Sequence, residues 1–260
     1  MMNFDHPAAL VIGTVLSARR SAARITPEAA ARRLRMPTEL LLDIEAGQGH
    51  ITRNDIHRLC SLYGAPEEAV ALSGMATVAW YPEMGRPRTG NDPFAAPRYD
   101  RAYGSTERLS TVMRHSQQVR WLSPRIPPLL RAPALAATDL PTAPVAWPAP
   151  RPWDVFVVGE KALERAGRSE ETAVQIRHLL ALREAGAQIH LLPLPHDVGE
   201  VIELTLPGGT VLARSHCHPA YQATDELSAD IDNALAATIT GMDPLEQALT
   251  HQSAGDRRTR

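Results

Sequence analysis

The chain has 260 residues, of which 44% are hydrophobic and 5% aromatic, and its formal net charge at pH 7 is -2. This length suffices for one large domain or two smaller ones with a real hydrophobic core. The near-neutral charge excludes a global basic field that would draw the whole chain to nucleic acid, so any DNA binding has to depend on a local patch.

The N-terminal segment lacks the features of a secretory signal and of a membrane span. Its apolar run, residues 8–16, is about half as long as the roughly 20 residues that a span requires. The charge order, acidic before the run and arginines after it, is the reverse of that in a secretory signal. Cys60 and Cys217 are too few for a disulfide framework and are typical of a reducing compartment. We therefore expect a cytoplasmic protein that does not enter a membrane.

Residues 8–74 predict five short helices. Apolar residues at helical spacing place the first before Arg24. Thr26 followed by Pro27 is a typical helix start, because the side chain caps the helix and proline lacks an N–H that would go unpaired there. The third helix is expected to be capped by Thr38 or Met36 and to run to Gly47, and the last two are expected from about residue 53 to 63 and from Pro66 to about Gly74.

Beyond residue 74 the sequence predicts mixed structure. Two stretches rich in proline or glycine, residues 80–100 and 141–152, are expected to be irregular or extended. The remaining segments predict helices over 105–122, 169–186 and 225–239, strands over 153–159 and 187–194, and a hairpin over 201–215 that turns at 207–209.

Residues 12–74 resemble the Xre-type, lambda-repressor-like helix-turn-helix domain. The resemblance is carried by IGTVLSARR, ITPEAAARRLRM, TELLLDIEAG and DIHRLCSLYGAPEE. Residues 105–240 further resemble the C-terminal domain of unknown function on many actinobacterial regulators of this type, through IPPLLRAPALAA and residues 159–194. The resemblance implies a DNA-binding transcriptional regulator that forms a homodimer and whose second domain senses a ligand or meets a partner protein.

The expected fold class is therefore α+β, with a five-helix bundle followed by a mixed domain that has a small sheet. The predicted layout is a helix-turn-helix domain over 1–76, a linker over 77–104, an effector, partner or ligand-pocket domain over 105–250, and a disordered tail over 251–260.

In such a domain the second helix crosses the phosphates and the N-terminal end of the third helix enters the major groove. Phosphate contacts position the protein, and base contacts specify the sequence. The residues that the resemblance assigns to the DNA backbone are Arg33, Arg35, Gln48 and Arg53, and those that approach bases are Thr38, Glu39 and Leu40.

Several positions depart from the pattern of these regulators. Pro27 stands where glutamine is common, and Arg35 replaces the turn glycine. Acidic and apolar residues stand where polar donors are usual: Glu39, Leu40, Leu42 and Asp43. Over residues 1–70, eight arginines oppose eight acidic residues and no lysine occurs. A DNA reader and a bundle that no longer binds DNA both fit these residues, the latter with Leu40 and Leu42 as a dimer or partner surface.

The segment RSHCHPAY, residues 214–221, is the densest group of reactive side chains. On a continuing strand, His216 and His218 would point to one face and Cys217 to the other. The two histidines could share a metal or act as acid and base, although no ligand spacing completes a zinc motif. Hydrogen-bonded histidines at a strand edge are the simpler interpretation.

The alternative function is a helix-turn-helix-derived enzyme or binding protein for a small apolar metabolite, acting by rearrangement, cyclisation or hydrolysis. Its catalytic residues would be His216, His218 and Cys217, and its ligand-binding residues Trp121, Trp153, His190 and His196. The simpler interpretation of the tryptophans is packing of the second domain. The sequence has no phosphate-binding glycine loop, nucleophile elbow, H-E-x-x-H or dinucleotide fingerprint, so no cofactor or metal is predicted.

Overall fold

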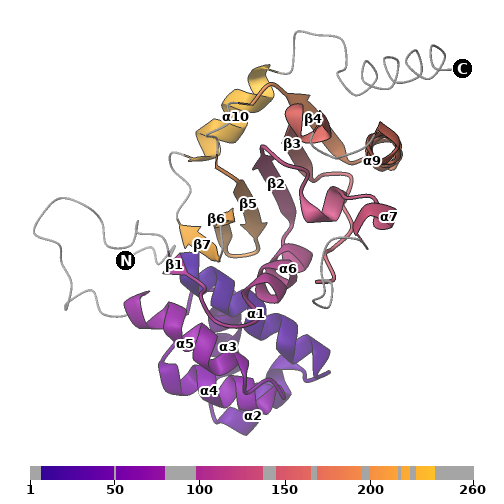
Figure 1. Ribbon diagram of the computed structural model, residues 1–260. Helices are drawn as coiled ribbons and strands as arrows, with labels where there is room; N and C mark the ends of the chain where they lie inside the picture. Colours follow the sequence, from indigo (N-terminus) through magenta and orange to yellow (C-terminus); the bar gives the residue numbers. More distant parts are fainter. Residues whose placement is uncertain are drawn as a thin grey trace, which may run out of the picture. The chain divides into compact units, whose positions relative to one another are not determined.

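The computed structural model describes residues 7–49, 51–79, 98–136, 145–164, 169–194, 199–215, 218–222 and 227–237. The chain forms two compact units. The first consists of Met1–Gln117 and Glu203–Thr224, and the second of Gln118–Ile202 and Asp225–Arg260. Each contains helices and strands (Figure 1), which confirms the predicted α+β class.

The first unit contains the five predicted helices, which surround a common core. They are α1 (Pro7–Ala22), α2 (Pro27–Leu34), α3 (Thr38–Glu45), α4 (Arg53–Leu62) and α5 (Glu68–Ala79). Local signals fix their ends. The Thr26 hydroxyl accepts from the Ala29 N–H at 3.2 Å, and Thr52 forms a reciprocal capping box with Asp55. Gly47, with φ 73°, follows the end of α3.

The N-terminal half of α1 is buried on all sides, with every residue from Pro7 to Leu16 buried. One face of it packs in the helical bundle. The remaining cover comes from α6 (Ser105–His115) and from two strands of the same unit, β6 (Gly209–Ser215) and β7 (Pro219–Gln222). A helix that is apolar all round has to be enclosed in this way. The helical bundle is therefore continuous with the elements that follow it in this unit.

The strands of the first unit lie in the order β1-β7-β6-β5. β1 (Arg98–Tyr99) pairs antiparallel with β7, with Tyr99 opposite Ala220, and β7 pairs antiparallel with β6. Residues 203–206 of β5 (Val201–Leu206) also belong here, and Pro207 and Gly208 connect them to β6 as the predicted hairpin.

The second unit contains a parallel sheet of β2 (Gln118–Ser123), β3 (Val155–Gly159) and β4 (Gln188–Leu192). β3 lies in the middle and is buried along its whole length, as its uninterrupted apolar sequence VFVVG requires. The helical segments of this unit are η1 (Pro128–Leu130), α7 (Pro133–Ala136), α8 (Lys161–Glu164), α9 (Ser169–Glu184) and α10 (Leu227–Ala237).

One predicted helix is wrong in its extent. Residues 105–122 do not form a single helix: α6 ends at His115 and β2 begins at Gln118. Ser116 takes an extended conformation (ψ 152°), and its hydroxyl donates to the Met113 carbonyl at 2.7 Å, which ends the helix. The following residues then pair with β3, with Trp121 opposite Phe156.

The two units differ in their bounds from the predicted layout. The segment expected as a linker contains β1 and Asp100, which is 2% exposed. Residues 203–224 belong with the helical bundle rather than with the second unit. Both differences arise from pairing between residues far apart in the sequence. Residues 80–97 and the tail over 251–260 lie outside the described residues.

Candidate nucleic-acid interface

The turn between α2 and α3 is built around Arg35, which adopts a left-handed conformation with φ 55° and ψ 46°. This is the position at which similar domains carry glycine, and a side chain there costs roughly 1–2 kcal/mol. The Met36 N–H donates to the Ala31 carbonyl at 3.0 Å. Arg58 of α4 donates to the last carbonyl of α2, Leu34, at 2.6 Å. The turn is therefore held firmly, although Arg35 is strained.

The helix α3 turns one face inward and one face to solvent. Leu41, Ile44 and Glu45 are buried. The outward residues are Glu39, Asp43, Leu40 (39% exposed) and Leu42 (46% exposed). The residue before the helix is Pro37, rather than the expected Met36 or Thr38, and it supplies no side-chain cap. The first turn of α3 is thus open to an outside acceptor.

Glu45 anchors the other end of α3. Arg20 of α1 binds its carboxylate in a bidentate manner, with Nε–Oε1 and Nη2–Oε2 distances of 2.8 Å. The Tyr63 hydroxyl donates to Oε1 at 3.1 Å, and burial followed by the Glu45 charge raises the pKa of this phenol. The hydrogen bond to Glu45 likewise raises the pKa of Arg20. Glu45 and Arg20 are therefore occupied in the fold and leave the outer face of α3 to other residues.

Two glycines allow close contacts at the same end of α3. A Cβ at Gly13 of α1 would lie 2.5 Å from the Ile44 carbonyl oxygen. A Cβ at Gly208, in the β5–β6 turn, would lie 2.0 Å from the Ala46 carbonyl oxygen. The C-terminal end of α3 is thus enclosed by backbone from two sides, while its N-terminal end is open.

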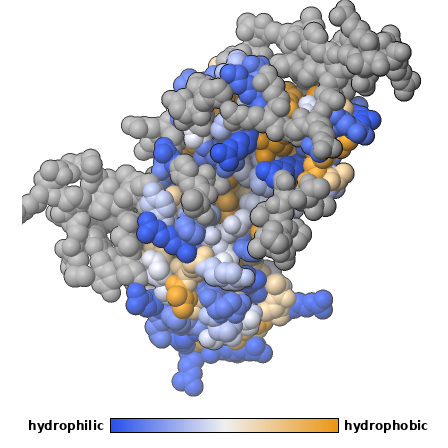
Figure 2. Space-filling view, in the orientation of Figure 1, coloured by the Kyte–Doolittle hydropathy of each residue, from blue (hydrophilic) through white to orange (hydrophobic). Residues whose placement is uncertain are grey.

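The residues assigned to DNA contact lie at the surface, as expected for contact residues. Arg33, Arg35, Gln48 and Arg53 are exposed, as are Glu39 and Leu40, and Thr38 is half-buried. They come from α2, the turn, α3, the segment after α3 and the start of α4. Figure 2 shows hydrophilic side chains gathered over the end of the helical bundle where α2 lies in Figure 1.

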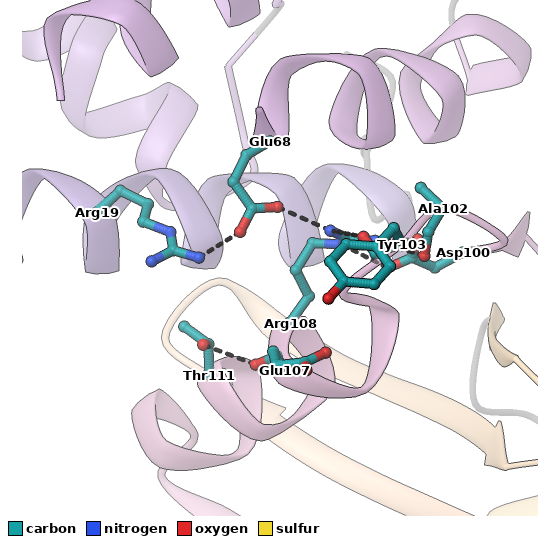
Figure 3. Close-up of polar contacts among 8 residues, drawn as sticks. All are labelled: Arg19, Glu68, Asp100, Ala102, Tyr103, Glu107, Arg108 and Thr111. Atoms are coloured by element: carbon teal, nitrogen blue, oxygen red, sulfur yellow. Dashed lines mark hydrogen bonds and ion pairs between the residues drawn. The ribbon is translucent and has the colours of Figure 1, made fainter. Parts of the chain in front are cut away.

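A second group of charges in the first unit was not predicted from the sequence (Figure 3). Arg108 of α6 donates to Asp100 at 2.7 Å through both Nε and Nη2, and to Glu68 of α5 at 2.8 Å. Arg19 of α1 pairs with the other oxygen of Glu68. Burial lowers the pKa of Arg108, but the hydrogen bonds to Asp100 and Glu68 outweigh it, so the net shift is upward. These ion pairs join the helical bundle to α6 and the start of the strands.

The residues of the metabolite hypothesis are not gathered into one site within the described part of the chain. Trp121 is buried, with Nε1 donating to Glu200 at 3.0 Å and its ring edge-on to Trp147 at 6.2 Å. Trp153 is 52% exposed and lies under the Arg151 guanidinium. His190 is half-buried on β4, and His218 is exposed before β7. His196, His216 and Cys217 lie outside the described residues.

Among the residues that the structure describes, no group of three histidine, cysteine, aspartate or glutamate side chains is placed to hold a metal ion. None of the helices in the described ranges is long and apolar enough to cross a membrane.

Comparison with known protein families identifies the N-terminal helices as a helix-turn-helix domain. Residues 11–72 match the family model of the helix-turn-helix domain, and the match covers most of α1, all of α2, α3 and α4, and the beginning of α5. The chain thus carries a helix-turn-helix domain. No curated protein matches the chain, and no solved structure matches it.

Proposed function

We propose that this protein is a DNA-binding transcriptional regulator that binds duplex DNA through α2, the turn at Arg35 and the N-terminal end of α3. The observation that carries the proposal is the distribution of exposed charges along these elements. The sequence balances its acidic and basic residues over 1–70, but the fold does not expose them equally.

Ion pairs engage as many basic as acidic residues of the helical bundle. Arg20 is bound to Glu45, Arg19 to Glu68, and Arg58 lies 3.7 Å from Asp55. Along α2 and the turn, residues 24–35, the exposed charges are Arg24, Arg32, Arg33 and Arg35 against Glu28, whereas Glu39 and Asp43 lie on the outer face of α3. A local excess of arginine next to an open helix end is what phosphate binding requires.

The strained conformation of Arg35 supports the same proposal. A glycine would fit this turn without the cost of a left-handed side chain. Strain that a sequence retains is often connected with function, because the strained group does something that the relaxed one would not. In our proposal the Arg35 guanidinium binds a phosphate, together with Arg33, Arg53 and the Gln48 amide, while Thr38, Glu39 and Leu40 approach the bases.

The finer features of the proposal follow from the resemblance to Xre-type regulators. We propose that the protein acts in the cytoplasm, where it reaches DNA, and binds as a homodimer, because helix-turn-helix dimers read two half-sites related by symmetry. The second unit would then sense a ligand or bind a partner protein. Analytical ultracentrifugation of the full chain with and without DNA tests the dimer.

The direct test of DNA binding is fluorescence anisotropy of a labelled duplex over a range of salt concentrations. Three phosphate-binding arginines predict a slope of log K against log salt of about -0.9 each, or about -3 per chain. Binding that is absent at low salt, or that does not weaken as salt rises, would remove the proposal.

A further inference from the structure

We infer that α3 reads its DNA site through acceptors and apolar groups, with Glu39 accepting from a cytosine amino group and Leu40 contacting a neighbouring thymine methyl. This inference rests on the proposed function and goes beyond it, because it names the base chemistry that the protein recognises.

The side chains of α3 contain almost no hydrogen-bond donors. Its sequence is TELLLDIE, in which only the Thr38 hydroxyl can donate. Guanine presents two acceptors in the major groove, so it is recognised by donors such as arginine. Cytosine presents an amino donor there, and thymine presents a methyl group. The outward face of α3 therefore matches cytosine and thymine and cannot satisfy a guanine except through Thr38.

Glu39 favours cytosine over adenine, although both carry an amino group in the major groove. Adenine places its N7 acceptor beside that amino group, whereas cytosine has no acceptor next to its own. A carboxylate has two acceptor oxygens and no donor. Its second oxygen would face the N7 lone pair of adenine, which is repulsive, but would meet no such group on cytosine.

Glu39 is available for this contact. It is exposed in the first turn of α3, and its carboxylate makes no hydrogen bond or ion pair with any residue in the described ranges. Two other carboxylates of the helical bundle are already engaged. Glu45 is held by Arg20 and Tyr63, and hydrogen bonds to its own backbone and to Thr26 lower the pKa of Glu28. Leu40 follows Glu39 directly and is 39% exposed, so its contact with a methyl would remove apolar surface from water.

A carboxylate that reads bases repels the phosphates at the same time. Neutralising Glu39 therefore has two opposite consequences. Affinity for unrelated DNA rises, because one repulsive charge is gone, while discrimination between bases is lost. If Glu39 had only a structural role, its replacement would leave the base preference unchanged.

The test is selection of bound sequences from a random duplex library by the full-length protein and by Glu39→Gln. The wild-type protein should select a cytosine at one position of each half-site. Glutamine pairs with adenine in the major groove, so Glu39→Gln should shift that position to adenine. Its affinity for the wild-type site should fall roughly 5- to 150-fold, which corresponds to the usual 1–3 kcal/mol of a good base contact.

Asp43→Asn is the matched control, because Asp43 is also exposed on α3 but lies one turn further from its N-terminal end. This variant should bind unrelated DNA more tightly and keep the cytosine preference. A circular dichroism melt shows that each variant is folded, and Glu39→Ala provides a second variant that should lose the preference without gaining adenine.

The outcomes separate the two proposals. An unchanged base preference in both Glu39 variants, or a wild-type half-site that contains no C·G pair within reach of α3, overturns this inference and leaves DNA binding in place. A wild-type protein that binds no duplex at any salt concentration overturns both.

Discussion

Gly208 lies directly against the main-chain carbonyl of Ala46, so that a Cβ on the glycine would come within 2.0 Å of the oxygen. Leu10 of α1 closes the same contact, with its Cδ2 at 2.8 Å from that Cβ position. The turn of the β5–β6 hairpin therefore fixes the end of the helix that we propose reads DNA. A segment that is distant in sequence holds the helix-turn-helix in shape.

Gly208→Ala should destabilise the protein, because the added methyl group cannot occupy the space of the Ala46 oxygen. Overpacking of this kind costs about 1–3 kcal/mol. Urea denaturation followed by circular dichroism measures the loss. Gly74→Ala serves as control, since nothing lies within 4 Å of its Cβ position in α5 and alanine should stabilise that helix by about 1 kcal/mol. Equal stability of wild type and Gly208→Ala would contradict the packing described above.

Replacing Glu45 with alanine should be far more harmful than replacing Glu39 on the same helix. The partly buried Arg20 would lose its counter-charge, for which the cost of about 3–5 kcal/mol of breaking a fully buried ion pair is an upper bound. Glu39→Ala changes an exposed residue, for which about 0.5 kcal/mol is the usual limit. Chemical denaturation of the two variants compares them. Similar losses in both would mean that Glu45 does not anchor α3.

Cys60 should be unreactive in the folded protein. Burial, followed by the Glu68 charge, raises the pKa of this thiol to about 12, so that almost none is thiolate near pH 8. In a Cys217→Ser background, labelling with a thiol-specific chromogenic reagent should follow global unfolding and accelerate on addition of urea. Rapid labelling in native buffer would show that the core between α4 and α5 opens locally.

The raised pKa of the Cys60 thiol also predicts how the stability of the protein depends on pH. The folded pKa lies above the unfolded one, so the contribution of the neutral thiol is complete below the unfolded value and is lost as pH rises toward about 12. Between pH 9 and about 12, the protein with Cys60 should therefore lose stability relative to a Cys60→Ala variant. A difference that stays constant over this window would show that the thiol titrates normally.

Arg35→Gly should separate stability from DNA binding. Glycine relieves the left-handed strain of roughly 1–2 kcal/mol but adds flexibility to the unfolded chain, so stability should stay equal or rise slightly. DNA affinity should fall, because a phosphate contact is lost. Arg24→Gly is a matched control, since Arg24 is also an exposed arginine at positive φ (57°) and has no assigned DNA contact. If both variants lose affinity equally, Arg35 has no special position in the interface.

The elements that were predicted correctly are those marked by local signals. Thr26 and Thr52 cap their helices, Gly47 ends α3, and the Pro207–Gly208 pair turns the hairpin. The missed elements depend on partners far along the chain. β2 begins within a predicted helix because it pairs with β3, and β1 and β7 are short strands without a distinctive pattern.

The features of the candidate site divide in the same way, into those that the sequence indicates and those that depend on distant residues. The exposure of Arg33 and Arg35 was expected from the resemblance, whereas the left-handed conformation of Arg35 was not predicted, although its place at a turn where glycine is usual was a signal for it. The Arg20–Glu45 anchor and the contact at Gly208 were not expected, since neither is visible from spacing in the sequence. One sequence signal could have predicted that other segments pack around α1. Residues 7–16 have no polar face, and such a helix has to be covered on every side.

The most direct test of the central claim is the salt dependence of duplex binding by an Arg33→Ala/Arg35→Ala variant, with Arg125→Ala as control. Arg125 is exposed in the second unit and has no assigned role in DNA binding. Loss of two phosphate contacts should make the slope of log K against log salt shallower by about 2 per chain, while the control keeps the wild-type slope. An unchanged slope in the double variant would contradict the proposal that these arginines hold the phosphates.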